Sequence, residues 1–161
     1  MIHMENLKID KTKAKSLYKE ASKEFKVMLE DTFGKDYFSD KITDKIKTWE
    51  DVCEILNINS ISSLPYKNPK NKQEKSLNAL FKIQKISEVL NEGWVENWCD
   101  DNQYKYYPYF NRRVSSGWVM CSYRCNCYDG VLSFGSYYKS SDLALFAGTQ
   151  FIDIYIDYLP E

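Results

Sequence analysis

The sequence predicts a small α+β protein in which helices pack on a small antiparallel sheet. Three observations support this class. Apolar residues recur at spacings of three and four up to Asn91, aromatic and β-favouring runs follow from Tyr104, and a helical apolar pattern returns after Ser140. We therefore expect helices from both ends of the chain to pack on a sheet that forms mainly after residue 100.

The length of 161 residues corresponds to about one domain. A domain of this size buries roughly two thirds of its unfolded surface, so it needs neither a disulfide nor a metal ion to fold. We expect a flexible N-terminal tail over residues 1–10 and a single domain over residues 11–161. Its helical part covers residues 11–92, and the sheet with the C-terminal helix covers residues 93–159.

The first expected helix runs from Ala14 to Leu29, and Gly34 fits its end. Lys15, Lys19 and Lys23 lie along its flank. A solvent-exposed face interleaved with glutamates is favoured for this flank, and a phosphate-contacting stripe is the alternative.

Two further helices are expected before residue 92. Thr48 caps the first of them, and Asp51 three residues later completes a pattern that resembles a capping box. Its apolar face is formed by Trp49, Val52, Cys53 and Leu56. After a loop from Ser60 to Lys72, the next helix runs from about Gln73 to Asn91, and Gly93 ends it.

The second half favours strands. A first strand covers Tyr104–Phe110, where Pro108 restricts it to a sheet edge or to the end of a strand. A second strand covers Trp118–Tyr128, and Asp129-Gly130 then predicts a two-residue hairpin that returns through Val131–Phe134.

The last expected helix begins at Ser140 or Ser141 and stops at Pro160. Its apolar face consists of Leu143, Phe146, Ala147, Ile154, Tyr155 and Tyr158.

The cysteines of the second half are the sharpest feature of the sequence: Cys99, Cys121, Cys125 and Cys127. Four thiolates can hold zinc tetrahedrally, but such sites favour paired C-x2-C turns, and the last three cysteines follow a C-x3-C-x-C pattern. Alternation along a strand places Cys121, Cys125 and Cys127 on one face with Val119 and Tyr123. We expect this face to pack in the core, with metal binding and redox chemistry as the alternatives.

The residue types present argue against an enzyme. The single histidine, His3, precedes Met4, a candidate natural start, so histidine-dependent nucleophiles, bases and metal ligands are absent from the expected domain. Asp100-Asp101 is favoured as a hydrophilic turn over a catalytic pair. The stretch Gly130–Gly135 has the wrong spacing for a nucleotide-binding loop. We expect no catalytic residue, no metal site and no cofactor.

A cluster of aromatic and arginine residues is the best binding candidate. Arginine beside aromatic side chains at a sheet edge can hold a base or a phosphate, and tyrosine and arginine are enriched at protein interfaces. A plain hairpin tip is the simpler interpretation of the two adjacent arginines. The candidate binding residues are Tyr104, Tyr106, Tyr107, Tyr109, Arg112, Arg113 and Arg124.

Several motifs together resemble a family of small, largely uncharacterised proteins encoded by phages and prophages of Bacteroidota. The motifs are Leu90-Asn-Glu-Gly-Trp94, Trp98, Tyr104-Lys-Tyr-Tyr-Pro108, Gly117-Trp118, Tyr138–Ala144 and Phe146–Ile152. The resemblance spans roughly residues 45–158. It implies a phage context, in which accessory proteins commonly bind host machinery, including defence systems. It supplies no catalytic residue, and the cysteine-rich strand and the lysine-rich first helix depart from the pattern.

The expected function is therefore non-enzymatic binding and modulation of a host protein, with inhibition of a defence system as one form of it. The alternative is a nucleic-acid or nucleotide-binding protein that uses the aromatic and arginine region. The net charge is −1, so the chain has no global field toward nucleic acid or membrane. No apolar run approaches the roughly 18 residues of a membrane span, and the N-terminus lacks a secretory signal. Five cysteines in such a chain predict a reducing cytoplasm, that of the bacterial host.

Overall fold

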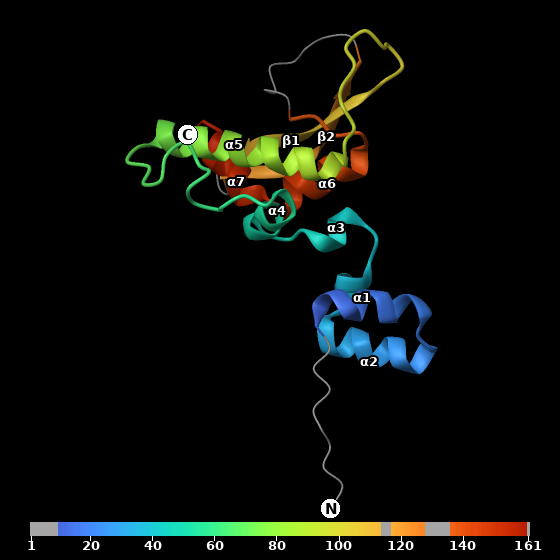
Figure 1. Cartoon of the computed structure of the whole chain (residues 1–161). Helices are drawn as coiled ribbons and strands as arrows, with labels where there is room; N and C mark the ends of the chain where they lie inside the picture. The colour runs from blue at the N-terminus through green and yellow to red at the C-terminus, as the bar shows by residue number, and fades with distance from the viewer. Residues whose placement is uncertain (1–9, 114–116, 128–135, 161) are drawn as a thin grey trace, which may run out of the picture. The chain divides into compact units, whose positions relative to one another are not determined.

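The computed structural model describes residues 10–113, 117–127 and 136–160. The chain divides into two compact units, residues 1–45 and residues 46–161. Helices pack on a small antiparallel sheet in the second unit, so the predicted α+β class is confirmed (Figure 1).

The first unit is helical, with α1 (Lys11–Glu20), α2 (Lys23–Phe33), the 3-10 helix η1 (Lys35–Phe38) and α3 (Ile42–Lys45). The prediction of one continuous first helix is wrong, because Ala21 is extended and the Ser22 side chain accepts a hydrogen bond from the Phe25 N–H, which starts a new helix. The same break divides the predicted lysine flank, with Lys15 and Lys19 on α1 and Lys23 on α2. Figure 1 shows α1 and α2 side by side, and their contact buries Ala14 and Leu29.

The second unit opens with α4 (Trp49–Leu56), whose predicted cap is confirmed. Asp51 N–H donates to Thr48 Oγ1 at 3.2 Å, and Thr48 N–H donates to an Asp51 carboxylate oxygen at 2.8 Å. Trp49 is buried, and its indole N–H donates to the Ser60 carbonyl at 2.9 Å, which ties the following loop to this helix.

The long helix α5 (Lys72–Asn91) forms as predicted. It begins after Asn71, whose side chain accepts from the Glu74 N–H, and it ends where Glu92 and then Gly93 take positive φ values of 49° and 85°. Its inner face buries Ile83, Ile86 and Leu90. This helix is the central element of the second unit and contacts α4, α6 and α7.

The sheet is an antiparallel hairpin of β1 (Lys105–Arg113) and β2 (Gly117–Asn126). On the outer side of β1, the backbone of Tyr106 exchanges two hydrogen bonds with that of Tyr138. Backbone polar groups alternate in direction along a strand, so the nitrogen of Pro108 also points away from β2. The lack of an N–H at Pro108 therefore costs no hydrogen bond between the two strands. This agrees with the predicted location of Pro108 at a sheet edge.

A β-bulge changes the faces of β2. Tyr109 pairs with Ser122 and Phe110 pairs with Met120, so Cys121 has no partner in the register. The extra residue places Val119 and Cys125 on opposite faces, which the prediction of one continuous face missed.

The predicted core packing of the cysteines is therefore wrong in part. Of the three cysteines on the predicted face, Cys127 is buried, but Cys121 and Cys125 are exposed; Cys99, which lies outside that face, is exposed as well. The predicted hairpin at Asp129-Gly130 and its returning strand lie outside the described residues.

The C-terminal helix is divided into α6 (Ser141–Gln150) and α7 (Ile152–Tyr158). Ser140 caps α6 as predicted and accepts from the Leu143 N–H at 3.3 Å. The single predicted helix breaks at Phe151, whose φ of −110° and ψ of 29° lie outside the helical region. Helix α6 packs on both strands, α7 packs mainly on α5 (Figure 1), and none of the described helices is long and apolar enough to cross a membrane.

Asn91 joins the helical and C-terminal parts of the second unit. Its side-chain amide donates to the Tyr137 carbonyl at 2.7 Å and accepts from the Lys139 N–H at 3.0 Å. Ser87 donates to the same Tyr137 carbonyl at 2.8 Å. These bonds hold residues 137–139 against α5, and with them the backbone that pairs with β1.

We expect Asn91→Ala to lower the free energy of unfolding by about 2 kcal/mol, because it removes the bond to the Tyr137 carbonyl and leaves the Lys139 N–H without its acceptor. The comparison variant is Asn91→Asp, which keeps an oxygen that can accept from the Lys139 N–H. Urea unfolding of the three proteins measures the difference. Equal stability of Asn91→Ala and the wild type would show that this contact is not made in solution.

Candidate binding surface on the hairpin

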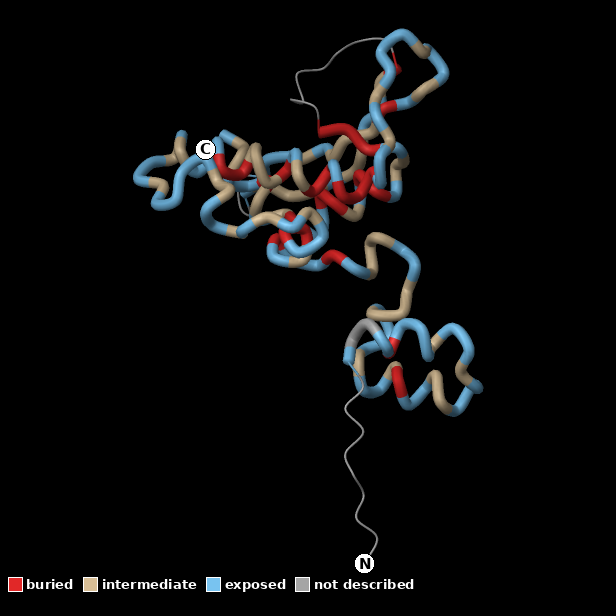
Figure 2. Tube along the Cα trace, in the orientation of Figure 1, coloured by how far each residue is buried: buried red, intermediate tan, exposed pale blue. Residues whose placement is uncertain are grey.

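The predicted tyrosines are not exposed in alternation. Tyr104 is 51% exposed and Tyr109 is 39% exposed, whereas Tyr106 and Tyr107 are half-buried. Alternation of side chains along a strand would expose either Tyr104 with Tyr106 or Tyr107 with Tyr109, and the structure exposes neither pair. Tyr104 precedes β1, and both faces of the strand are covered near its start and less covered toward its end (Figure 2).

The half-buried tyrosines pack within the protein. The Tyr106 ring contacts that of Tyr123 with centroids 5.6 Å apart, and the Tyr107 ring contacts that of Tyr137 at 6.0 Å. Burial raises the pKa of both Tyr106 and Tyr107 above the ordinary tyrosine value, as expected for rings packed within the protein. These two residues serve mainly as packing and stand apart from the exposed members of the predicted set.

Arg124 and Tyr109 form an exposed cation–π pair. Arg124 is the register partner of Tyr107, so Tyr109 is its diagonal neighbour on the same face. The guanidinium carbon lies 4.3 Å from the centroid of the Tyr109 ring. The pair presents an aromatic ring and a positive charge to solvent on two paired strands.

Arg112 and Arg113 are the last two residues of β1, opposite Trp118 and Gly117, so the first strand extends three residues beyond its predicted end at Phe110. Both are exposed. No described residue forms an ion pair with Arg112, Arg113 or Arg124. Trp118 is fixed by its indole N–H, which donates to the Pro160 carbonyl at 2.7 Å. Strand β1 therefore ends in two positive charges that no described residue pairs with.

Lys105 and Trp98 support this surface and were not foreseen. Lys105 is fully buried, and its Nζ lies 3.3 Å from the Asp100 carbonyl oxygen and 4.9 Å from the centroid of the Trp98 ring. The contact fixes the loop that carries Tyr104 against the start of β1. A lysine between tyrosines in a predicted strand gives no sign of burial, so only the tertiary structure shows this role.

Within residues 10–113, 117–127 and 136–160, no three His, Cys, Asp or Glu side chains are placed to hold a metal ion. Asp100 accepts from the Asn102 N–H at 2.9 Å, consistent with the predicted hydrophilic turn. Comparison with protein-family models, with curated proteins and with solved structures found no match.

Proposed function

We propose that this protein is a non-enzymatic phage accessory protein that binds and modulates a host protein in the bacterial cytoplasm. The exposed Tyr109–Arg124 pair carries the proposal. The contact surface is the outer hairpin, defined as Tyr104, Tyr109, Arg112, Arg113 and Arg124.

Tyrosine and arginine dominate the energetically important residues of protein interfaces, because they combine large apolar area with directed hydrogen bonds. The outer hairpin presents both types on paired strands, which reduces the entropy lost on binding. The three guanidinium groups make no ion pair with a described residue, so each is available to a carboxylate of the partner.

The second candidate is nucleic-acid binding by the same arginines, with tyrosine rings stacking on bases. The dependence of binding affinity on salt concentration distinguishes these two candidate functions. Nucleic-acid affinity falls steeply with rising salt because binding releases counterions, and a protein interface built on aromatic burial is far less sensitive. The net charge of −1 favours a protein partner.

We expect the variant Tyr104→Ala/Tyr109→Ala/Arg112→Ala/Arg113→Ala to reduce partner binding at least tenfold, since loss of one interface hot spot alone weakens binding by about 2 kcal/mol or more. Its melting temperature should change little, because all four side chains are exposed. Affinity capture from lysate of a Bacteroidota host, with quantitative mass spectrometry, measures the loss.

The matched control removes two exposed apolar and two exposed cationic side chains elsewhere: Ile61→Ala/Val95→Ala/Lys35→Ala/Lys41→Ala. It should capture the partner as the wild type does. Undiminished capture by the hairpin variant would place the interface elsewhere, and unfolding of that variant would show that the segment belongs to the core.

A further inference from the structure

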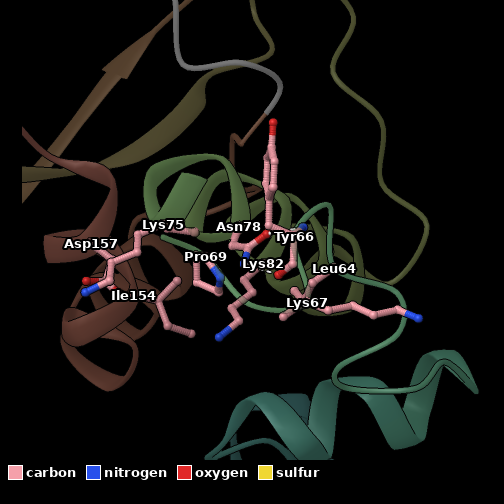
Figure 3. A pocket seen from close by; sticks show the side chains of 10 residues that line it. Leu64, Tyr66, Lys67, Pro69, Lys75, Asn78, Lys82, Ile154 and Asp157 are labelled. Atoms are coloured by element: carbon pink, nitrogen blue, oxygen red, sulfur yellow. Dashed lines mark hydrogen bonds between the residues drawn. The ribbon is translucent and has the colours of Figure 1, made fainter. Parts of the chain in front are cut away.

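A pocket of about 240 Å³ lies on the second unit, away from the outer hairpin residues (Figure 3). Its walls come from α5, from α7 and from the loop over residues 57–71 that joins α4 to α5. We call its aliphatic lining residues the floor: Leu64, Pro69, Ala79 and Ile154. Charged side chains surround this floor: Lys67, Lys75, Lys82 and Asp157.

The loop wall is held in place by a buried asparagine. Asn78 is 7% exposed; its side-chain oxygen accepts from the Tyr66 N–H at 2.9 Å, and its amide donates to the Tyr66 carbonyl at 2.8 Å. The asparagine thus pairs with the loop backbone as a neighbouring strand would. A wall fixed by two hydrogen bonds favours a pocket that exists before any ligand arrives.

The pocket is positively charged. Its lining contains three lysines, Lys67, Lys75 and Lys82, and one carboxylate, Asp157, which gives a net charge of +2. None of the three lysines forms an ion pair with a described residue. The surrounding sequence adds to the positive potential, because residues 67–82 hold five lysines and one acidic residue, Glu74.

Shape and charge limit what can occupy the pocket. Small-molecule sites measure about 300–1,000 Å³, so this pocket fits an amino-acid side chain better than a whole cofactor. The apolar floor favours an aliphatic or aromatic group. Figure 3 shows the three lysine ammonium groups spread in different directions around the floor, which does not suit one phosphate held at a single point.

We propose that this pocket binds an acidic segment of a partner protein, with one apolar side chain seated on the floor and carboxylates beside Lys67, Lys75 and Lys82. The site is independent of the outer hairpin. An extended acidic segment meets the three lysines at separate points, while its apolar side chain excludes water from the floor. Nucleic acid offers the charge and aromatic bases, so the test below includes a single-stranded oligonucleotide as the competing ligand.

The test uses the full chain and a fluorescent peptide in which one leucine is flanked on both sides by glutamates. Anisotropy at low salt should report binding, and replacing the leucine by glycine should weaken it. The variant Lys67→Gln/Lys75→Gln/Lys82→Gln should lose about tenfold in affinity, since each exposed ion pair contributes about 0.5 kcal/mol, or about twofold. The control Lys13→Gln/Lys35→Gln/Lys41→Gln changes the net charge equally and should bind normally.

Three results would overturn the proposal. These are equal loss in both lysine variants, equal affinity for the glycine peptide, or tighter binding of a single-stranded oligonucleotide of the same charge. The hairpin variant Tyr104→Ala/Tyr109→Ala/Arg112→Ala/Arg113→Ala should bind the peptide normally. A failure at the pocket is thereby distinguished from a failure of the proposed hairpin function.

Discussion

Replacing Gly148 by leucine should destabilise the protein by about 3 kcal/mol, at the upper end of the range for overpacked cores. Gly148 lies on the face of α6 that packs against the hairpin and is buried. A Cβ atom at this position would lie 2.8 Å from Pro108 Cβ and 3.0 Å from Met120 Cγ. The proline ring cannot rotate away, so a larger side chain must separate the helix from the strands.

Two further variants distinguish the effect of this clash on stability from the effect of helix propensity. Gly148→Ala gains up to about 1 kcal/mol of propensity, which offsets part of the clash, so its destabilisation should be smaller than that of leucine. Thr149→Leu, at an exposed position of the same helix, should change stability by less than about 0.5 kcal/mol. Urea unfolding measures all three. A Gly148→Leu protein as stable as the wild type would contradict the packing of α6 on Pro108.

Elements encoded in local sequence were predicted well. Thr48 and Asp51 form the expected capping box, and α5 ends at Asn91 just before Gly93, because capping depends on residues within one turn. The helix breaks at Ala21 and Phe151 were missed. In both cases apolar spacing continues across the break, so periodicity alone does not reveal that two helices with separate packing partners replace one.

The hairpin shows a second limit of sequence reasoning. The strands and Pro108 at an edge were predicted, but one extra residue, Cys121, reversed the expected faces of part of β2. No residue type marks a bulge of this kind. The prediction of buried cysteines failed at Cys121, the extra residue, and at Cys125, which shares a face with Tyr106 and Pro108 but is exposed. The exposure of the tyrosines also depends on tertiary structure, because α6, α7 and Tyr137 cover parts of the strands.

Two polar residues inside α5 were not identified either. Nothing in the sequence distinguishes Asn78 and Asn91 from other polar helix residues. Both are buried, and the side chain of each forms hydrogen bonds with the backbone of another segment of the chain. Their partners, Tyr66 and Tyr137, are set by tertiary structure. The candidate pocket depends on the first of these contacts, and for that reason the sequence predicted the hairpin surface but not the pocket.

Tyr138 and Tyr155 form a buried hydroxyl pair with consequences at high pH. Their oxygens are 2.8 Å apart, and both side chains lie in the core of the second unit. Burial raises the pKa of Tyr138 and of Tyr155 above the ordinary value of about 10. In the unfolded chain both hydroxyls ionise near pH 10, while in the folded chain they stay protonated.

The native state then binds more protons than the unfolded state above about pH 10, so stability falls as the pH rises. Each tyrosine should contribute a loss of about 1.4 kcal/mol per pH unit, and the pair about 2.7 kcal/mol per unit, over the range in which only the unfolded chain ionises. The stability that the pair contributes is fully present below about pH 10.

We expect Tyr138→Phe/Tyr155→Phe to remove most of this alkaline loss while changing stability little at neutral pH, because both members of the hydrogen bond are replaced together. Tyr138→Phe alone should destabilise at neutral pH by about 1–3 kcal/mol, since it leaves the buried Tyr155 hydroxyl without its partner. Urea unfolding at about pH 8 and about pH 11 measures both effects, on either side of the ordinary tyrosine pKa. If the double variant loses as much stability at high pH as the wild type does, other groups cause the alkaline unfolding, such as the half-buried Tyr106 and Tyr107.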